Sequence, residues 1–155
     1  MNFGMPNAGA NRAQPLGFAL EFLVCSHQVS GRSAWTLGHL ALVKILYLEN
    51  HAVFAEQVTR QFLGAHRVTV VPSLAAARSS LATGGFDLVL SDYDLDDGKG
   101  EEFVRECRAS HPLLPIIAVS SHEAGNAALI AAGASTVCSK MEFDRIQQVI
   151  GGFET

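Results

Sequence analysis

From residue 43 onward, short apolar runs alternate with longer amphipathic segments, and this alternation leaves few folds open to the chain. The runs are apolar throughout and rich in β-branched residues, which is typical of strands that helices cover on both faces. We expect strands over residues 44–48, 67–71, 86–91, 115–120 and 136–139. Because strands and helices alternate, the pattern predicts an α/β fold with a parallel sheet between two layers of helices.

The segments between these runs carry helix signals. Phe54, Val58 and Phe62 lie at positions i, i+4 and i+8, so they form one stripe along a helix, which we expect to face the core. Ser73 is a typical N-cap residue at the start of the second segment. We expect helices over residues 51–63, 73–81, 101–110, 123–132 and 143–150.

Composition and charge exclude several classes of function. The chain has 155 residues, of which 48% are hydrophobic, and this is enough for one domain with a full core. Its net charge of −4 argues against a nucleic-acid partner that is held through phosphates. No apolar run approaches the roughly 20 residues that a membrane helix needs. We therefore expect neither nucleic-acid nor membrane partners.

Cysteine usage and the N-terminal segment add two expectations. Cys25, Cys107 and Cys138 are odd in number and lack a CxxC spacing, which indicates a reducing compartment and hence a cytoplasmic protein. Cys107 and Cys138 are expected to be small core residues. Residues 1–42 precede the alternation, so we assign them to an N-terminal extension of unknown function, partly disordered or helical. Residues 43–155 form the expected folded domain.

Four of the expected strands end in residues that can do chemistry. Glu49 and Asn50 follow the first strand, Asp92 the third, Ser120 the fourth and Lys140 the fifth. In a parallel α/β sheet these ends share one edge, where such folds place their sites. Clustered oxygens suit a hard cation such as Mg²⁺, while a hydroxyl and an ammonium suit phosphoryl oxygens. An aspartate among them can accept a phosphoryl group, because carboxylates serve as nucleophiles for that transfer.

Acidic residues crowd the segment after the third strand. Six of them lie within eleven positions: Asp92, Asp94, Asp96, Asp97, Glu101 and Glu102. Repulsion among like charges costs stability, so we expect a cation or neighbouring bases to offset it.

Four segments resemble the receiver domain of two-component response regulators, in order and in spacing: KILYLEN, FDLVLSDYDLDDGKG, PIIAVSS and GASTVCSK. The resemblance covers residues 43–150. It implies a flavodoxin-like, doubly wound (βα)5 fold with a five-stranded parallel sheet in the order 2-1-3-4-5. It also implies that a histidine kinase or a phosphotransfer protein passes a phosphoryl group to an aspartate, with Mg²⁺ as cofactor. Such a chain is no enzyme beyond its own phosphorylation and dephosphorylation.

The resemblance assigns roles by position. Asp92 matches the phosphoacceptor, Ser120 the hydroxyl that follows the phosphoryl group, and Lys140 the phosphate-binding lysine. The implied metal ligands are Glu49, Asn50, Asp92 and the backbone carbonyl of Asp94. The side chains of Asp94 and His122 fall where the family tunes the lifetime of the phosphoryl group.

Three positions depart from the family pattern. Asn50 stands where a metal-binding carboxylate is usual, so we expect Mg²⁺ to bind weakly. Met141 replaces a proline that usually follows the lysine. Val137 occupies the aromatic switch position and is too short and stiff for the usual swing.

Because the aromatic switch is missing, we expect the signal to leave through residues 121–132. Gly125 and Asn126 lower the helix propensity near the start of this segment, so small free energies can shift it. The same face would bind a downstream protein partner. The sequence ends soon after the last expected helix, so we expect either a single-domain regulator or one piece of a larger protein.

Two other interpretations stay open. A pseudo-receiver, which keeps the fold as a phosphate-independent interaction module, is favoured by the three departures. A phosphatase of the haloacid-dehalogenase type is suggested by Asp92-x-Asp94 with a later serine and lysine. Those enzymes place a further acidic motif after the lysine, whereas only 15 residues follow Lys140.

Overall fold

A computed structural model of the protein describes residues 42–153. Its main sheet has five parallel strands in the order β2-β1-β3-β6-β7. They are β1 (Lys44–Leu48), β2 (Arg67–Val71), β3 (Leu88–Ser91), β6 (Ile116–Ala118) and β7 (Thr136–Val137). Counted as five strands along the chain, this is the order 2-1-3-4-5, so the predicted fold is confirmed. The proposed extension lies outside the described residues except for Leu42.

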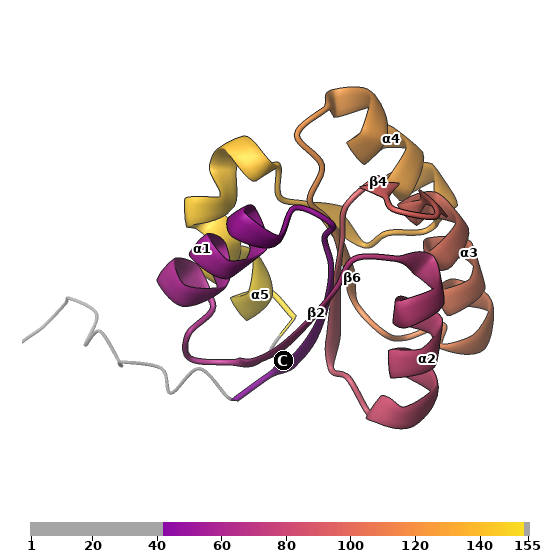
Figure 1. Ribbon diagram of the computed structural model, residues 1–155, viewed down its shortest axis with the longest axis horizontal. Coiled ribbons are helices and arrows are strands. Elements are labelled where there is room, and N and C mark those ends of the chain that lie inside the picture. Colours follow the sequence, from indigo (N-terminus) through magenta and orange to yellow (C-terminus); the bar gives the residue numbers. More distant parts are fainter. Residues whose placement is uncertain (1–41, 154–155) are drawn as a thin grey trace, which may run out of the picture. The chain divides into compact units, whose positions relative to one another are not determined.

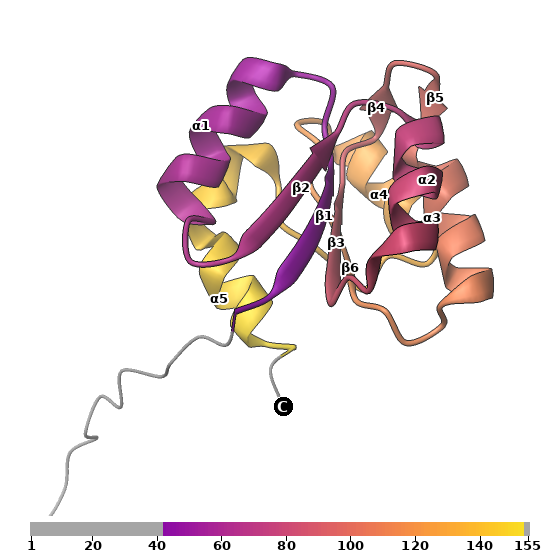
Figure 2. The same ribbon diagram turned by 60° about the horizontal axis from the view of Figure 1, so that its bottom comes forward.

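Helices cover both faces of this sheet (Figures 1 and 2). They are α1 (Ala52–Phe62), α2 (Leu74–Gly84), α3 (Gly100–Ser110), α4 (Glu123–Ala132), the 3-10 helix η1 (Lys140–Arg145) and α5 (Ile146–Gly151). The helices α1 and α5 lie on one face, while α2, α3 and α4 lie on the other. Among the described residues, no helix combines the length and the apolarity that crossing a bilayer requires.

The strands bury side chains on both faces, because successive side chains of a strand point in opposite directions. In β1, Ile45 and Tyr47 join the core under α1 and α5, whereas Leu46 and Leu48 join the core under α2, α3 and α4. All four are fully buried. Two buried faces explain why the strand is apolar throughout, as the sequence indicated.

Local signals start α2 and end α4 close to where the sequence predicted. Ser73 caps α2 by accepting a hydrogen bond from the backbone N–H of Ala76 at 3.2 Å. Gly133 ends α4 with a φ of 115°, a left-handed conformation that glycine adopts without strain. Cys107 and Cys138 are buried in the core as predicted, and burial raises the pKa of the Cys138 thiol to about 11.

Two regions differ from the expected pattern. The segment after β7 starts with η1, because the Ser139 hydroxyl accepts a hydrogen bond from the Met141 N–H at 3.3 Å and so opens a turn directly after the strand. The acidic segment contains a small antiparallel hairpin, β4 (Asp94–Leu95) with β5 (Gly98–Lys99), that the sequence did not indicate. Leu95 is 8% exposed and anchors this hairpin on the core.

Candidate functional site

Three charged side chains converge at the carboxyl edge of the sheet. Glu49 follows β1, Asp92 follows β3 and Lys140 follows β7 in the chain. The Lys140 Nζ lies 2.5 Å from the Glu49 Oε2 and 2.6 Å from the Asp92 Oδ2. The exposed fractions of the side chains are 12% for Lys140, 0% for Glu49 and 7% for Asp92. The parallel sheet therefore brings these three residues together, as the pattern of strand ends predicted.

Buried neighbours hold both carboxylates in place. The Glu49 Oε1 accepts a hydrogen bond from the His51 N–H at 2.9 Å, and its Oε2 accepts one from the Tyr47 hydroxyl at 3.3 Å. Burial, with the negative charge of Glu49 next to it, raises the pKa of Tyr47 far above its ordinary value, so the phenol stays a donor. The Asp92 Oδ1 accepts a hydrogen bond from the Tyr93 N–H at 2.7 Å. Each buried charge therefore has a partner, which is what burial of a charge requires.

An aromatic cluster packs behind the ammonium group. The Lys140 Nζ lies 5.1 Å from the centroid of the Phe54 ring, within the range of a cation–π interaction. Phe54 and Tyr47 both pack on Phe143, with ring centroids 6.0 Å and 6.1 Å from it. The stripe that we expected to be core is indeed packed against the core. Its contact with the site cation was not predicted, since Phe54 and Lys140 lie far apart in the sequence.

Ser120 lies at the same edge, but its hydroxyl faces α4. It is 1% exposed, and its Oγ accepts a hydrogen bond from the His122 N–H at 3.3 Å. A Cβ added at Gly125 would lie 2.7 Å from this Oγ, so the first turn of α4 packs directly on the hydroxyl. Within residues 42–153, the Ser120 hydroxyl makes no hydrogen bond to Asp92 or Lys140.

The remaining residues of the predicted site lie nearer the surface. Asn50 is half-buried in the loop after β1. Asp94 lies in β4, where its exposed carboxylate pairs with Lys99. His122 is exposed and precedes α4 without capping it through its side chain. Val137 is 38% exposed, so the aromatic switch position lies at the surface in this chain.

Bases pair with three of the six acids in the acidic segment. Asp92 pairs with Lys140, Asp94 pairs with Lys99, and Glu101 pairs with Arg105 at 3.2 Å. These are the neighbouring bases that the charge density required. Asp97 has a role that we missed: its carboxylate accepts hydrogen bonds from the N–H groups of Leu74 and Ala75 at 2.6 Å and 3.0 Å. These bonds cap α2 and lower the pKa of Asp97.

The oxygen donors fit a divalent cation in part. Glu49 and Asp92 already direct one oxygen each to a single cation, the ammonium of Lys140. Carboxylate oxygens are the ligands that Mg²⁺ prefers. Within the described residues, no group of three or more His, Cys, Asp or Glu side chains is placed to hold a metal ion.

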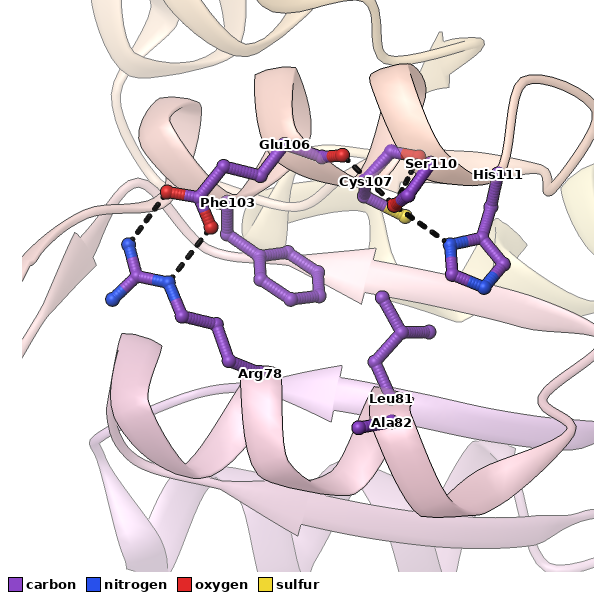
Figure 3. A pocket seen from close by; sticks show the side chains of 8 residues that line it. All are labelled: Arg78, Leu81, Ala82, Phe103, Glu106, Cys107, Ser110 and His111. Atoms are coloured by element: carbon purple, nitrogen blue, oxygen red, sulfur yellow. Dashed lines mark hydrogen bonds and ion pairs between the residues drawn. The ribbon is translucent and has the colours of Figure 1, made fainter.

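A separate hollow of about 210 Å³ lies between α2 and α3 (Figure 3). Phe103 and Cys107 line its floor, and the paired side chains of Arg78 and Glu106 border it with hydrogen bonds of 2.7 Å and 2.8 Å. None of the converging charged residues lines this hollow. The candidate site is therefore the carboxyl edge of the sheet and not this groove.

Comparisons with known proteins bear on the family and the fold of the chain. The family model of the response regulator receiver domain matches residues 45–150. The receiver domain of the sensor histidine kinase PA1611 from Pseudomonas aeruginosa, solved with a magnesium ion coordinated in its active-site cleft, is 26% identical. Its TM-score is 0.63, and the match covers 73% of this chain and 98% of that one.

Two further structures share the fold at lower identity. The chemotaxis protein CheY4 of Vibrio cholerae is 18% identical with a TM-score of 0.65, covering 73% of this chain and 99% of that chain. A CheY-like receiver domain protein of Methanospirillum hungatei is 18% identical with a TM-score of 0.61, covering 74% and 98%. No curated protein matches the chain.

Proposed function

Since the chain belongs to the receiver-domain family of response regulators, we propose that Asp92 accepts a phosphoryl group from a histidine kinase or a phosphotransfer protein. The observation that carries this proposal is the convergence of Glu49 and Asp92 on the ammonium of Lys140. A carboxylate that is buried, oriented by a backbone N–H and paired with a lysine is poised to be a phosphoryl acceptor.

The transfer of the phosphoryl group needs only Asp92 and the phosphoryl donor as reactants. A carboxylate oxygen of Asp92 forms a bond to the phosphorus, and the bond from phosphorus to the donor breaks. The leaving group, a histidine nitrogen or the acetate of acetyl phosphate, keeps the electron pair of that bond. The Lys140 ammonium lies 2.6 Å from Asp92, so it can pair with a phosphoryl oxygen as negative charge builds up there.

Mg²⁺ is the proposed cofactor, weakly bound. The receiver domain from Pseudomonas aeruginosa holds a magnesium ion in its active-site cleft. In this chain the proposed ligands are Glu49, Asn50, Asp92 and the backbone carbonyl of Asp94, with Asp94 and His122 flanking the phosphoryl group. When bound, the ion would offset negative charge on the phosphoryl oxygens and the acceptor.

The output is proposed to be a protein–protein contact. Ile130 and Val137 are 41% and 38% exposed beside a groove that α4 forms with the end of β7. Exposed apolar side chains along one groove favour a downstream protein partner at residues 121–132. This proposal makes residues 43–155 the receiver domain, with residues 1–42 as an extension, and gives the chain no catalysis beyond its own phosphorylation and dephosphorylation.

We expect incubation with acetyl phosphate and Mg²⁺ to add one phosphoryl mass, and Asp92→Asn to abolish it, because the amide is not a nucleophile for this transfer. Intact-mass spectrometry measures the result. Asp96→Asn is the matched control, since it removes one exposed acid from the same loop and should leave the yield unchanged. An undiminished yield of phosphorylated protein in Asp92→Asn would show that Asp92 is not the phosphoacceptor. No label on the unmodified chain would favour the pseudo-receiver, and turnover of phosphate esters would favour the phosphatase.

Asn50→Asp is expected to tighten Mg²⁺ binding by about 1–3 kcal/mol, which is roughly fivefold to 150-fold, because a charged ligand replaces a neutral amide. Isothermal titration calorimetry with Mg²⁺ measures the affinity. Asp96→Asn, which carries the opposite charge change outside the proposed ligand set, controls for bulk electrostatics. Equal or weaker binding in Asn50→Asp would mean that this side chain does not face the ion.

A further inference from the structure

Asn126 is one of the few polar residues that are buried among the described residues, with 7% of its surface exposed. We propose that Asn126 is a positioning residue: its amide fixes the backbone of Ser120, so that the Ser120 hydroxyl meets a phosphoryl group on Asp92 by side-chain rotation alone. This role rests on the proposed function, because the phosphoryl group belongs to it.

The amide of Asn126 satisfies both backbone groups of Ser120. The Ser120 N–H donates to the Asn126 Oδ1 at 2.8 Å, and the Asn126 Nδ2 donates to the Ser120 carbonyl at 3.0 Å. Ser120 lies beyond Ala118, the last residue of β6. Buried backbone groups need partners, and here the Asn126 oxygen serves the Ser120 N–H, while the Asn126 amide shares the Ser120 carbonyl with the backbone N–H of Lys140.

The same carbonyl also ties Ser120 to the residue that pairs with Asp92. The Ser120 carbonyl accepts a hydrogen bond from the Lys140 N–H at 3.3 Å and one from the Ser139 hydroxyl at 3.5 Å. The backbone of Ser120 is therefore fastened to α4 on one side and to the start of η1 on the other. Moving this backbone would break the bonds that also position Lys140, whereas rotating the hydroxyl would not.

The hydroxyl itself starts from a defined position. Its Oγ accepts a hydrogen bond from the His122 N–H and lies under Gly125, where a Cβ would come within 2.7 Å of it. A change between staggered χ1 rotamers redirects this oxygen without any backbone movement. Asn126 thus separates the two motions: it holds the backbone and leaves the side chain free to respond.

The first measurement concerns the clamp in the unphosphorylated protein. Asn126→Leu removes both hydrogen bonds, and Asn126→Asp keeps the acceptor but replaces the amide donor. Hydrogen exchange of the Ser120 amide, followed by NMR, should accelerate about tenfold in Asn126→Leu, the ratio expected for the loss of one buried hydrogen bond. Ala127→Leu, an exposed change in the same helical turn, should leave that exchange unchanged. Unchanged exchange of the Ser120 amide in Asn126→Leu would overturn the proposal.

The second measurement asks whether Asn126 acts through the hydroxyl. The rate constant of phosphorylation by acetyl phosphate should fall about tenfold in Asn126→Leu, or in Asn126→Asp if the apolar variant does not fold. In a Ser120→Ala background the same substitution should change the rate by less than twofold, because no hydroxyl remains to be positioned. An equal fall in both backgrounds would show a general structural effect and overturn the role. Absence of label on the unmodified chain would instead overturn the proposed function. The exchange measurement needs no phosphorylation, so it tests the hydrogen bonds of Asn126 independently of that outcome.

Discussion

Gly100→Ala is expected to lower the free energy of unfolding by about 3 kcal/mol, at the upper end of the usual cost of overpacking. Gly100 begins α3, and its N–H donates to the Tyr93 carbonyl at 2.7 Å. A Cβ at this position would lie 2.0 Å from the carbonyl oxygen of Asp92 and 2.8 Å from the Ser91 Oγ. The clash is with backbone, which cannot rotate away, so the helix and the loop that carries Asp92 must separate.

Urea denaturation measures this loss, and Gly151→Ala is the matched control. A Cβ at Gly151 meets nothing within 4 Å, and the residue ends α5, so alanine should be neutral or slightly stabilising there. Because the clash displaces Asp92 itself, the folded fraction of Gly100→Ala should also accept less phosphoryl label. A urea midpoint equal to that of the unmodified protein would contradict the close packing of α3 on the loop that carries Asp92.

Arg108→Met is the second large effect, with an expected loss of about 3 kcal/mol in the free energy of unfolding. The guanidinium of Arg108 binds the carbonyls of Pro112 and Leu114 at 2.7 Å and 3.0 Å through Nη1. It also binds the Gly133 carbonyl at 3.1 Å through Nε and 2.8 Å through Nη2. One side chain thus joins the end of α3 to the end of α4, and methionine keeps the bulk while it removes every donor.

Arg105→Met is the control on the same helix. Within residues 42–153, Arg105 makes only an ion pair with Glu101, and its side chain is 57% exposed, so its loss should cost no more than about 0.5 kcal/mol. Arg108→Lys should recover less than half of the stability, because an ammonium lacks the planar fork that reaches several carbonyls. Equal urea midpoints for Arg108→Met and Arg105→Met would show that these bonds add nothing.

The alternation of strands and helices and the meeting of Glu49, Asp92 and Lys140 could be predicted because both follow from local patterns. An apolar run indicates a strand. In a parallel sheet the residues that follow each strand then lie at the same edge. The resemblance of four short segments to one family supplied the strand order and the roles. No such pattern reveals contacts between distant segments.

Two of the contacts that were missed are of this long-range kind. Asp97 caps a helix that begins 23 residues earlier, and Arg108 reaches a carbonyl 25 residues later. Asn126 and Gly125 illustrate the limit most clearly. By helix propensity they weaken α4, yet the structure buries both, one to bind Ser120 and the other to let the helix approach it. A residue with low propensity for the helix that contains it can still be required by a segment that packs against that helix.

The division of the acidic loop among separate partners has an evolutionary consequence. Asp94 pairs with Lys99, while Asp97 serves the first turn of α2, so each acid depends on a different part of the chain. Asp94 and Lys99 can be exchanged together without disturbing the cap, and asparagine or serine can replace Asp97 as a capping residue. The surface charge around Asp92 can therefore change while the pairing of Asp92 with Lys140 is kept.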